Sequence, residues 1–435
     1  MVSIKLLASS KARKMLKPSQ ALRLVQSRVV TVLLSLSAAK LRHLVLRGAL
    51  GGSIYAMLAF ALGGCYSRPW ELIGVLVRMK YVVCRAVMAY IARGCKPRFP
   101  EWTLSFEVVQ SVMRCAMKSY GHRMILPASA QHVRWQSAWV GTAIGHLSCG
   151  KHGTRVEPFY HNGLEHVWVR PKSSSPSSRR LVVLYIHGGG FAVLSPRLYI
   201  YLANEFITRV TAKLREELGF DGSFHVEVLL ANYRKVPEYA YPIPPQDAYC
   251  MYEYLVHVEK LSPRQIIIAG DSAGGCLALT TLLRARDQSS TQLQPLAGLL
   301  LCPFADMEVD CNEDRAPHCV ITDSCQLAIS KYHPRIGEAS AWGDASPAHC
   351  NLEGLPPVYI QAAELDYLFP HAQSLYAKAK GDGVNDWTLD VHKNVPHVFA
   401  LYPTPIMPIA HKGLDAIASF TATQFHKTLR VPDAA

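Results

Sequence analysis

The chain has 435 residues, a formal net charge of +14, and hydrophobic side chains at half of its positions. This length exceeds one minimal domain, and the apolar content excludes a largely disordered polymer. The basic residues are not interleaved with aromatic ones, so the charge does not predict nucleic-acid binding. The twelve cysteines include no CxxC pair and no Cys/His spacing typical of zinc, and nothing else requires a metal or an organic cofactor.

The positive charge is concentrated at the N-terminus. Eleven of the 46 Lys and Arg precede the first acid, Glu71, and the remaining 35 nearly balance the 32 acids. Residues 48–67 carry no charge, and twenty such residues are about the length of a membrane-spanning helix. We therefore treat residues 1–95 as a basic, apolar region and expect a membrane anchor there, with the catalytic part on the lumenal side of the endoplasmic reticulum. The alternatives are a mitochondrial targeting segment and helices of a lid.

Residues 96–152 are expected to form a helical cap or lid, and residues 153–430 a catalytic domain. Two alternating runs, 155–160 and 164–169, flank His161-Asn162-Gly163, which predicts a hairpin with a two-residue turn. The next predicted strands are 181–186, 227–231, 266–269 and 298–302, separated by predicted helices at 198–218, 245–259 and 273–286. This alternation predicts a doubly wound, mostly parallel sheet. Residues 305–348 show no clean period, which indicates an insertion or cap over the active site.

A candidate nucleophile follows the predicted strand 266–269. Ser272 is the centre of Gly270-Asp271-Ser272-Ala273-Gly274, and the helix 273–286 begins directly after it. A sharp turn between a strand and a helix holds a serine hydroxyl above the edge of the sheet, where it can attack a substrate. The five-residue pattern alone is common, so its meaning depends on a partner motif.

The partner motif is His187-Gly188-Gly189-Gly190, directly after the predicted strand 181–186. Backbone N–H groups without neighbouring side chains can donate to an oxyanion, together with the N–H of the residue after the nucleophile. We therefore predict an oxyanion hole built by Gly188, Gly189, Gly190 and Ala273.

A serine nucleophile also needs a general base and an acid that orients it. Glu364 and Asp366 follow a predicted strand at 358–362, and we prefer Asp366 because it lies farther into the loop. His397 follows the next predicted strand, 389–392, and we prefer it to His392, which lies within that strand. The order serine, acid, histidine is that of α/β-hydrolases.

From residue 155 to 429 the chain resembles the hormone-sensitive-lipase-like branch of the α/β-hydrolase superfamily. The resemblance is carried by His187-Gly-Gly-Gly-Phe191, Asn232-Tyr-Arg-Lys-Val-Pro-Glu238, Gly270-Asp-Ser-Ala-Gly-Gly275, and residues 355–399. It implies the α/β-hydrolase fold with a helical cap and an N-terminal helical extension, and it maps Ser272, Asp366 and His397 onto the catalytic triad. Tyr239 stands where relatives often carry His, and Tyr-Leu-Phe after Asp366 also departs from the pattern.

The expected activity is that of a serine carboxylic-ester hydrolase acting on a small, lipophilic ester without metal or cofactor. Two alternatives use the same fold: a receptor that binds without catalysis, and an amidase or formamidase. The presence of His397 favours an enzyme over a receptor. Four cysteines close in sequence allow one disulfide in a lumenal domain, although reduced, buried cysteines are favoured; they are Cys302, Cys311, Cys319 and Cys325.

Overall fold

The structure is a computed structural model that describes residues 60–173, 179–288 and 294–430. Most of the predicted anchor, residues 48–59, lies outside the described residues. Within the described part, no helix combines the length and the apolar character needed to cross a bilayer. The contacts divide the chain into two units, Met1–Ala61 and Leu62–Ala435, and the sheet belongs to the second.

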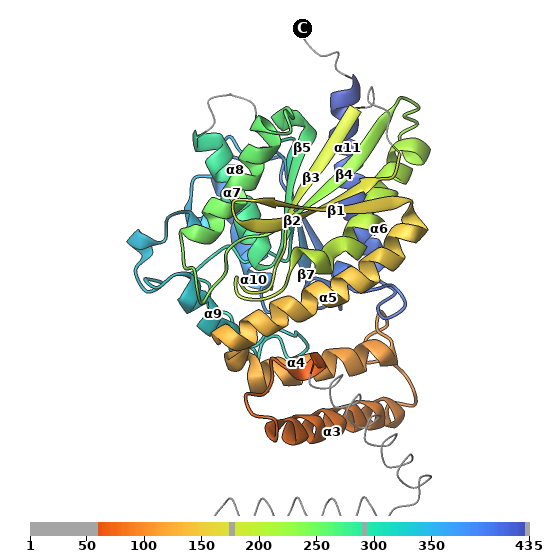
Figure 1. The fold of residues 1–435 in the computed structure, drawn as a ribbon, viewed down its shortest axis with the longest axis vertical. Helices are drawn as coiled ribbons and strands as arrows, with labels where there is room; N and C mark the ends of the chain where they lie inside the picture. Colours follow the sequence, from red (N-terminus) through yellow and green to blue (C-terminus); the bar gives the residue numbers. More distant parts are fainter. Residues whose placement is uncertain (1–59, 174–178, 289–293, 431–435) are drawn as a thin grey trace, which may run out of the picture. The chain divides into compact units, whose positions relative to one another are not determined.

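An eight-stranded sheet forms the centre of this unit, in the order β1-β2-β4-β3-β5-β6-β7-β8 (Figure 1). β2 is antiparallel to both of its neighbours, β1 and β4, and every other neighbouring pair is parallel. This confirms the predicted mostly parallel sheet. The strands are β1 Thr154–His161, β2 Leu164–Pro171, β3 Arg179–Ile186, β4 Phe224–Ala231, β5 Ile266–Asp271, β6 Ala297–Leu301, β7 Val358–Ala363 and β8 Thr388–His392.

The predicted hairpin is also confirmed. His161 pairs with Leu164, which leaves Asn162 and Gly163 as a two-residue loop between β1 and β2. Both loop residues have positive φ, 50° and 72°, as the hairpin turn that fits the strand twist requires.

Helices cover both faces of the sheet. Successive residues of β3 enter different cores: Val183 packs with α6 and α11 on one face, and Leu184 packs with α7, α8 and α10 on the other. A strand buried on both faces is apolar throughout, which explains the uninterrupted runs in the sequence. The helices are α6 Ile200–Ala212, α7 Ile243–His257, α8 Ala273–Gln288, α10 Phe369–Gly381 and α11 Ala410–Arg430.

The predicted helix 198–218 comprises three segments. It opens with a 3-10 turn, Pro196–Tyr199, continues as α6, and ends in a π-helical turn, Lys213–Glu217. Ser195 caps its start by accepting the N–H of Arg197, and Gly219 follows its end with a φ of +62°. The start and stop signals in the sequence therefore located this element correctly.

Three long helices precede the sheet: α3 Glu71–Ala92, α4 Leu104–Met124 and α5 Pro127–His152 (Figure 1). Residues 96–152, predicted as a cap or lid, contain α4 and α5. The insertion at 305–348 contains α9 Cys325–Tyr332 and short 3-10 turns at Ala339–Ala341, Gly343–Ala345 and Pro347–His349. Short turns of this kind have no helical or strand period, which is why the sequence showed none.

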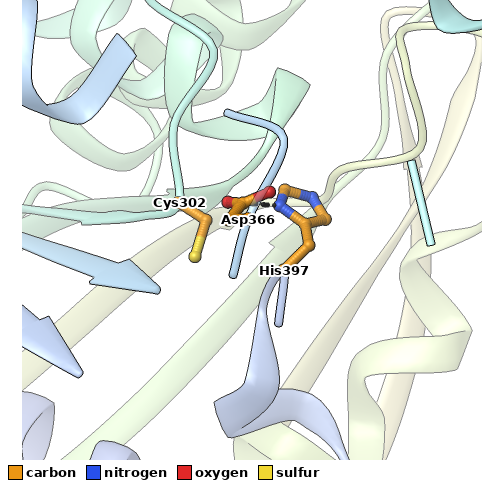
Figure 2. Close-up of side chains that lie close together, drawn as sticks. All are labelled: Cys302, Asp366 and His397. Atoms are coloured by element: carbon orange, nitrogen blue, oxygen red, sulfur yellow. Dashed lines mark hydrogen bonds and ion pairs between the residues drawn. The ribbon is translucent and has the colours of Figure 1, made fainter. Parts of the chain in front are cut away.

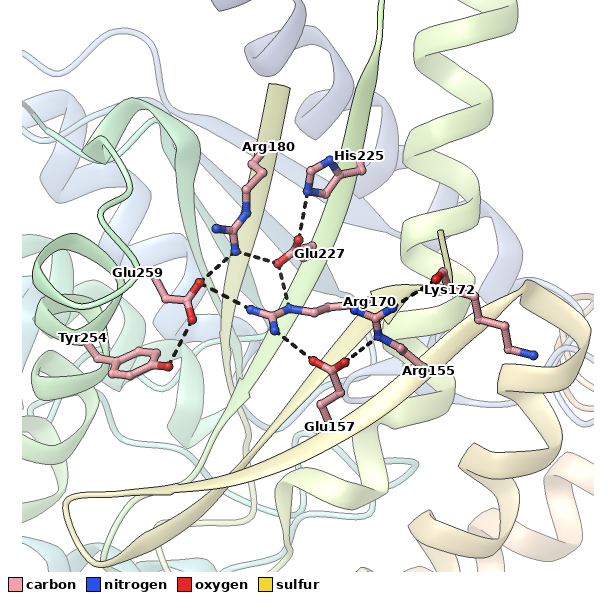
Figure 3. Close-up of polar contacts among 9 residues, drawn as sticks. All are labelled: Arg155, Glu157, Arg170, Lys172, Arg180, His225, Glu227, Tyr254 and Glu259. Carbon is pink, nitrogen blue, oxygen red and sulfur yellow. Dashed lines mark hydrogen bonds and ion pairs between the residues drawn. The ribbon is translucent and has the colours of Figure 1, made fainter. Parts of the chain in front are cut away.

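A network of charged side chains joins β1, β2, β3 and β4 at one edge of the sheet (Figure 3). Glu227 on β4 accepts from Arg170 on β2 at 3.0 Å and from Arg180 on β3 at 2.9 Å. Burial alone would raise the pKa of Glu227, but a hydrogen bond from His225 and the two guanidinium groups lower it to about 2. The carboxylate is therefore held in its charged form by the strands around it.

Candidate active site

Ser272 occupies the tight turn between β5 and α8. It has a φ of +54°, which is strained for a residue with a side chain and is typical of a nucleophile at a strand-to-helix turn. Its N–H donates to the carbonyl of Leu301 at 2.9 Å, and its own carbonyl accepts the N–H of Gly275 at 3.0 Å. These two bonds fix the turn between β6 and the first turn of α8. The serine is largely buried.

The turn lies directly against the end of β3, where the glycine loop begins. A Cβ atom on Gly274 would lie 2.1 Å from the carbonyl oxygen of Ile186, so no side chain fits there. The glycine therefore brings the backbone after Ser272 against the backbone before Gly188. The two sequence motifs, which are distant along the chain, are neighbours as predicted.

The glycine loop differs from the prediction at one position. The N–H of Gly188 donates to Asp271 Oδ1 at 2.9 Å and lies 3.2 Å from the hydroxyl of Tyr199. Because these acceptors already engage it, Gly188 is removed from the predicted oxyanion donors. Gly189 and Gly190 have positive φ, 106° and 59°, and keep their place as candidates with Ala273. A Cβ on Gly190 would meet only Ala328 of α9, at 3.9 Å, so there is room above this residue.

Asp271 links the two motifs. Its Oδ1 also accepts from the hydroxyl of Tyr185 at 3.0 Å, and its Oδ2 accepts from the hydroxyl of Tyr199 at 3.1 Å. Burial raises the pKa of this carboxyl to about 6, even though these donors favour the charged form. Nothing in the sequence marks the two tyrosines, because each looks like an ordinary apolar residue of its strand or helix.

The predicted base and acid are brought together (Figure 2). His397 Nδ1 lies 2.8 Å from Asp366 Oδ2, and both side chains are buried. The other carboxylate oxygen, Oδ1, accepts the N–H of Leu368 at 3.0 Å and the thiol of Cys319 at 3.4 Å. The acid is thus held in one orientation while it faces the imidazole.

The two rejected candidates point elsewhere. Glu364 is exposed and its carboxylate accepts the N–H of Asn394 at 3.0 Å. His392 Nε2 lies 2.8 Å from Asp390 Oδ2, and its ring packs against Phe399. The structure therefore favours Asp366 and His397 over both alternatives.

One further side chain adjoins this pair. Cys302, at the end of β6, accepts the N–H of Val398 with its sulfur at 3.3 Å. Among the described residues, Cys302, Asp366 and His397 form the one group of three or more His, Cys, Asp or Glu side chains whose possible ligand atoms all lie within 4.8 Å of one another. His397 Nδ1 and Asp366 Oδ2 are bonded to each other, so a cation would first have to break that bond, and the trio does not fit a resident metal. All twelve cysteines are free in the structure.

The helices before the sheet support the loops of this site. Arg114 of α4 donates to the carbonyls of Cys319 at 2.6 Å and Ala316 at 3.2 Å, in the loop that places Cys319 against Asp366. Trp102 donates from its indole to the carbonyl of Asn394 at 2.8 Å, in the segment that leads to His397. Residues 96–152 therefore contact the segments on both sides of the acid and base.

A small hollow, with a volume of about 20 Å³, lies beside the site and beneath α9. Phe304 contributes to its wall and donates its N–H to the carbonyl of Ser272 at 3.0 Å, and Tyr367, the residue after Asp366, contributes as well. The other wall residues are both apolar and polar, namely Asp306, Met307, Val309, Gln326, Ile329, Ile336 and His371.

Comparison with known proteins agrees with this geometry. Residues 183–401, just over half of the chain, match the model of a family described as having the alpha/beta hydrolase fold. The chain belongs to this α/β-hydrolase family. It is a carboxylesterase-like hydrolase, and hydrolysis of carboxylic esters is the class of reaction that its relatives support.

Three relatives illustrate the similarity. An acetyl-hydrolase of Streptomyces hygroscopicus is 29% identical over 258 residues, which cover 59% of this chain and 79% of that protein. Rabbit (Oryctolagus cuniculus) arylacetamide deacetylase is 35% identical over 184 residues, covering 40% of this chain and 43% of the deacetylase. The crystal structure of EstE5 soaked with p-nitrophenyl butyrate has a TM-score of 0.58 and 25% identity, covering 74% of this chain and 99% of EstE5.

Proposed function

We propose that this protein hydrolyses lipophilic carboxylic esters through Ser272, His397 and Asp366. The observation that carries the proposal is the buried contact between His397 Nδ1 and Asp366 Oδ2 at 2.8 Å, at the same edge of the sheet as the strained turn of Ser272. A carboxylate on Nδ1 holds the proton there and leaves Nε2 as the free base.

In the first half of the reaction, His397 Nε2 takes the proton of the Ser272 hydroxyl as its oxygen attacks the ester carbonyl. The N–H groups of Gly189, Gly190 and Ala273 donate to the oxyanion of the tetrahedral intermediate. His397 then gives its proton to the leaving alcohol, and an acyl-enzyme remains on Ser272. Water, activated by the same imidazole, attacks the acyl-enzyme and releases the acid.

The relatives support a preference for lipophilic esters, since one of them is named as a lipase. The relatives named as acetyl-hydrolase and as carboxylesterase/phospholipase support the same class of substrate. A second candidate, hydrolysis of aryl amides, is favoured by the similarity to rabbit arylacetamide deacetylase.

Activity-based labelling tests the nucleophile. A fluorophosphonate probe should label the wild-type protein and fail to label Ser272→Ala, while Ser195→Ala, which changes a helix cap, should still be labelled. A folded wild-type protein that resists the probe would favour a binding protein on this fold. Rates on p-nitrophenyl esters of graded chain length, and on a matched ester and anilide, then separate the esterase from the amidase.

A further inference from the structure

Helix α3 presents apolar side chains on two faces. Its inner face is buried against α4 and includes Leu72, Val75 and Met79. Its outer face is exposed although it is equally apolar. The large apolar residues there are 52–67% exposed, and with the exposed Cys84 they form what we call the α3 stripe: Trp70, Ile73, Val77, Tyr81, Cys84, Met88 and Ile91.

The α3 stripe is continuous along the helix. At about 100° per residue, its seven positions fall within an arc of about 80°, and at 1.5 Å per residue they extend for roughly 30 Å. Soluble monomers rarely expose a contiguous apolar surface of this kind, and a helix that is apolar on both faces is normally covered on both. The exposed stripe therefore indicates a partner.

The charges around the α3 stripe indicate which partner. Exposed basic residues border it, namely Arg78, Lys80 and Arg85. The single acid of the helix, Glu71, is paired with Arg123 at 2.6 Å. The preceding residues 1–59 contain ten Lys and Arg and no Asp or Glu. A second copy of the chain would bring the same positive charge to the contact, whereas an anionic surface complements it.

We propose that the α3 stripe docks the folded protein on an anionic phospholipid bilayer, with α3 lying in the plane of the headgroups. Interfacial helices of this kind bury an apolar face at the boundary between headgroups and acyl chains and place Lys and Arg beside the phosphates. Trp70 and Tyr81 have the amphipathic rings that favour this boundary. The docking surface does not depend on the chemistry at Ser272.

Vesicle co-sedimentation tests the surface with the full-length chain. Wild-type protein should bind vesicles of phosphatidylcholine and phosphatidylserine (roughly 7:3) and bind pure phosphatidylcholine far less. Replacing Ile73 or Val77 by Glu should weaken the binding roughly ten-fold each, the equivalent of losing one buried aliphatic side chain. Val258→Glu is the matched control, because Val258 is an equally exposed valine on the catalytic domain (60%). Equal binding by all variants would overturn the proposal.

A probe on the α3 stripe locates the contact directly. Cys84 and Cys95 are the exposed cysteines, so Cys95→Ser allows an environment-sensitive dye to be attached at Cys84. Its emission should shift to the blue on addition of the anionic vesicles, and lipids with a quencher below the headgroup should quench it. As a control, the same dye is attached at position 258 through Val258→Cys, in a protein that also carries Cys84→Ser and Cys95→Ser. The dye at this control position should not respond.

Two results would contradict the proposal. If the protein binds vesicles while the dye at Cys84 stays unchanged, another segment makes the contact. If the dye shifts with protein concentration in the absence of lipid, the α3 stripe pairs with a second copy. Turnover of a soluble short-chain ester, measured in parallel, tests the esterase separately, since none of these substitutions touches the site of Ser272.

Discussion

Asp366→Asn tests the proposed orientation of the base. In the wild type, Asp366 Oδ2 accepts the Nδ1 proton of His397 at 2.8 Å, and Oδ1 accepts the N–H of Leu368 at 3.0 Å. In the variant, the Leu368 N–H selects the orientation in which the amide oxygen replaces Oδ1. The amide NH2 then faces Nδ1 and moves the imidazole proton to Nε2, where it blocks proton transfer from Ser272. We expect kcat to fall about 10⁴-fold, as for the same change in a serine protease triad, which corresponds to about 5.5 kcal/mol of activation free energy.

The measurement is steady-state hydrolysis of a soluble p-nitrophenyl ester. KM should change little, because the carboxylate touches the base rather than the substrate. Glu364→Gln is the matched control: it alters the neighbouring acid, which is exposed and bonded to Asn394, and it should retain activity within about two- to three-fold. The assignment fails if Asp366→Asn keeps a tenth of the wild-type kcat, or if Glu364→Gln loses as much as Asp366→Asn does.

Three further changes test the structure around the site. Glu227 has a folded pKa of about 2 against its usual 4.5, so the stability that it contributes is fully present above pH 4.5 and is lost as the pH falls toward 2. Between pH 5 and pH 3 this loss amounts to about 2 kcal/mol, and Glu227→Gln should abolish it when the free energy of unfolding is measured in urea at the two pH values. If the wild type and Glu227→Gln lose the same amount of stability between pH 5 and pH 3, the ion pairs of Figure 3 are not the source of the acid loss. The effect of Asp271 on stability has the opposite pH dependence, because its pKa is raised from 3.8 to about 6. The free energy of unfolding should therefore fall by about 3 kcal/mol as the pH rises through that window. In Asp271→Asn, the free energy of unfolding should depend less on pH between about pH 4 and 7. Gly274→Ala should prevent soluble expression or lower Tm strongly, since its Cβ would lie 2.1 Å from a carbonyl oxygen. Gly153→Ala is the control, because Gly153 has a φ of +63° and nothing within 4 Å of the added Cβ; it should lower the free energy of unfolding by only about 1 kcal/mol. Equal effects of the two alanines would contradict the packing described here.

Much of the catalytic domain could be predicted because its signals are local. The strand β3 is apolar throughout since both its faces are buried, and Asn162-Gly163 fixes a two-residue turn by its backbone preferences alone. The acid and base could be chosen by their order after successive strands, because parallel strands end at the same edge of the sheet. The preference for Asp366 over Glu364 rests on its place farther into the loop, and that for His397 over His392 on its place in a loop rather than within the strand.

The details that could not be predicted depend on contacts between distant segments. Nothing in His187-Gly188-Gly189-Gly190 indicates that the first glycine N–H is engaged by Asp271, since that bond forms only when β3 and β5 pair side by side. Tyr185 is a strand residue like its neighbours until its hydroxyl meets the same carboxylate. The role of Arg114 likewise depends on where α4 packs, because its acceptors lie some 200 residues later in the chain.

Asp271 shows why a motif residue that does not contact the substrate can still matter for catalysis. Burial raises the pKa of its carboxyl to about 6, although Tyr185, Gly188 and Tyr199 donate hydrogen bonds to it. Keeping the carboxyl ionised in the folded protein therefore costs roughly 3 kcal/mol. An asparagine of the same shape would avoid that cost, so stability alone does not explain a carboxylate here. The positive charge of a protonated His397 is one of the influences that lower the pKa of Asp271 against the effect of burial. In the proposed mechanism, the ionised carboxylate of Asp271 would add to that of Asp366 in stabilising the imidazolium that forms when Ser272 is deprotonated.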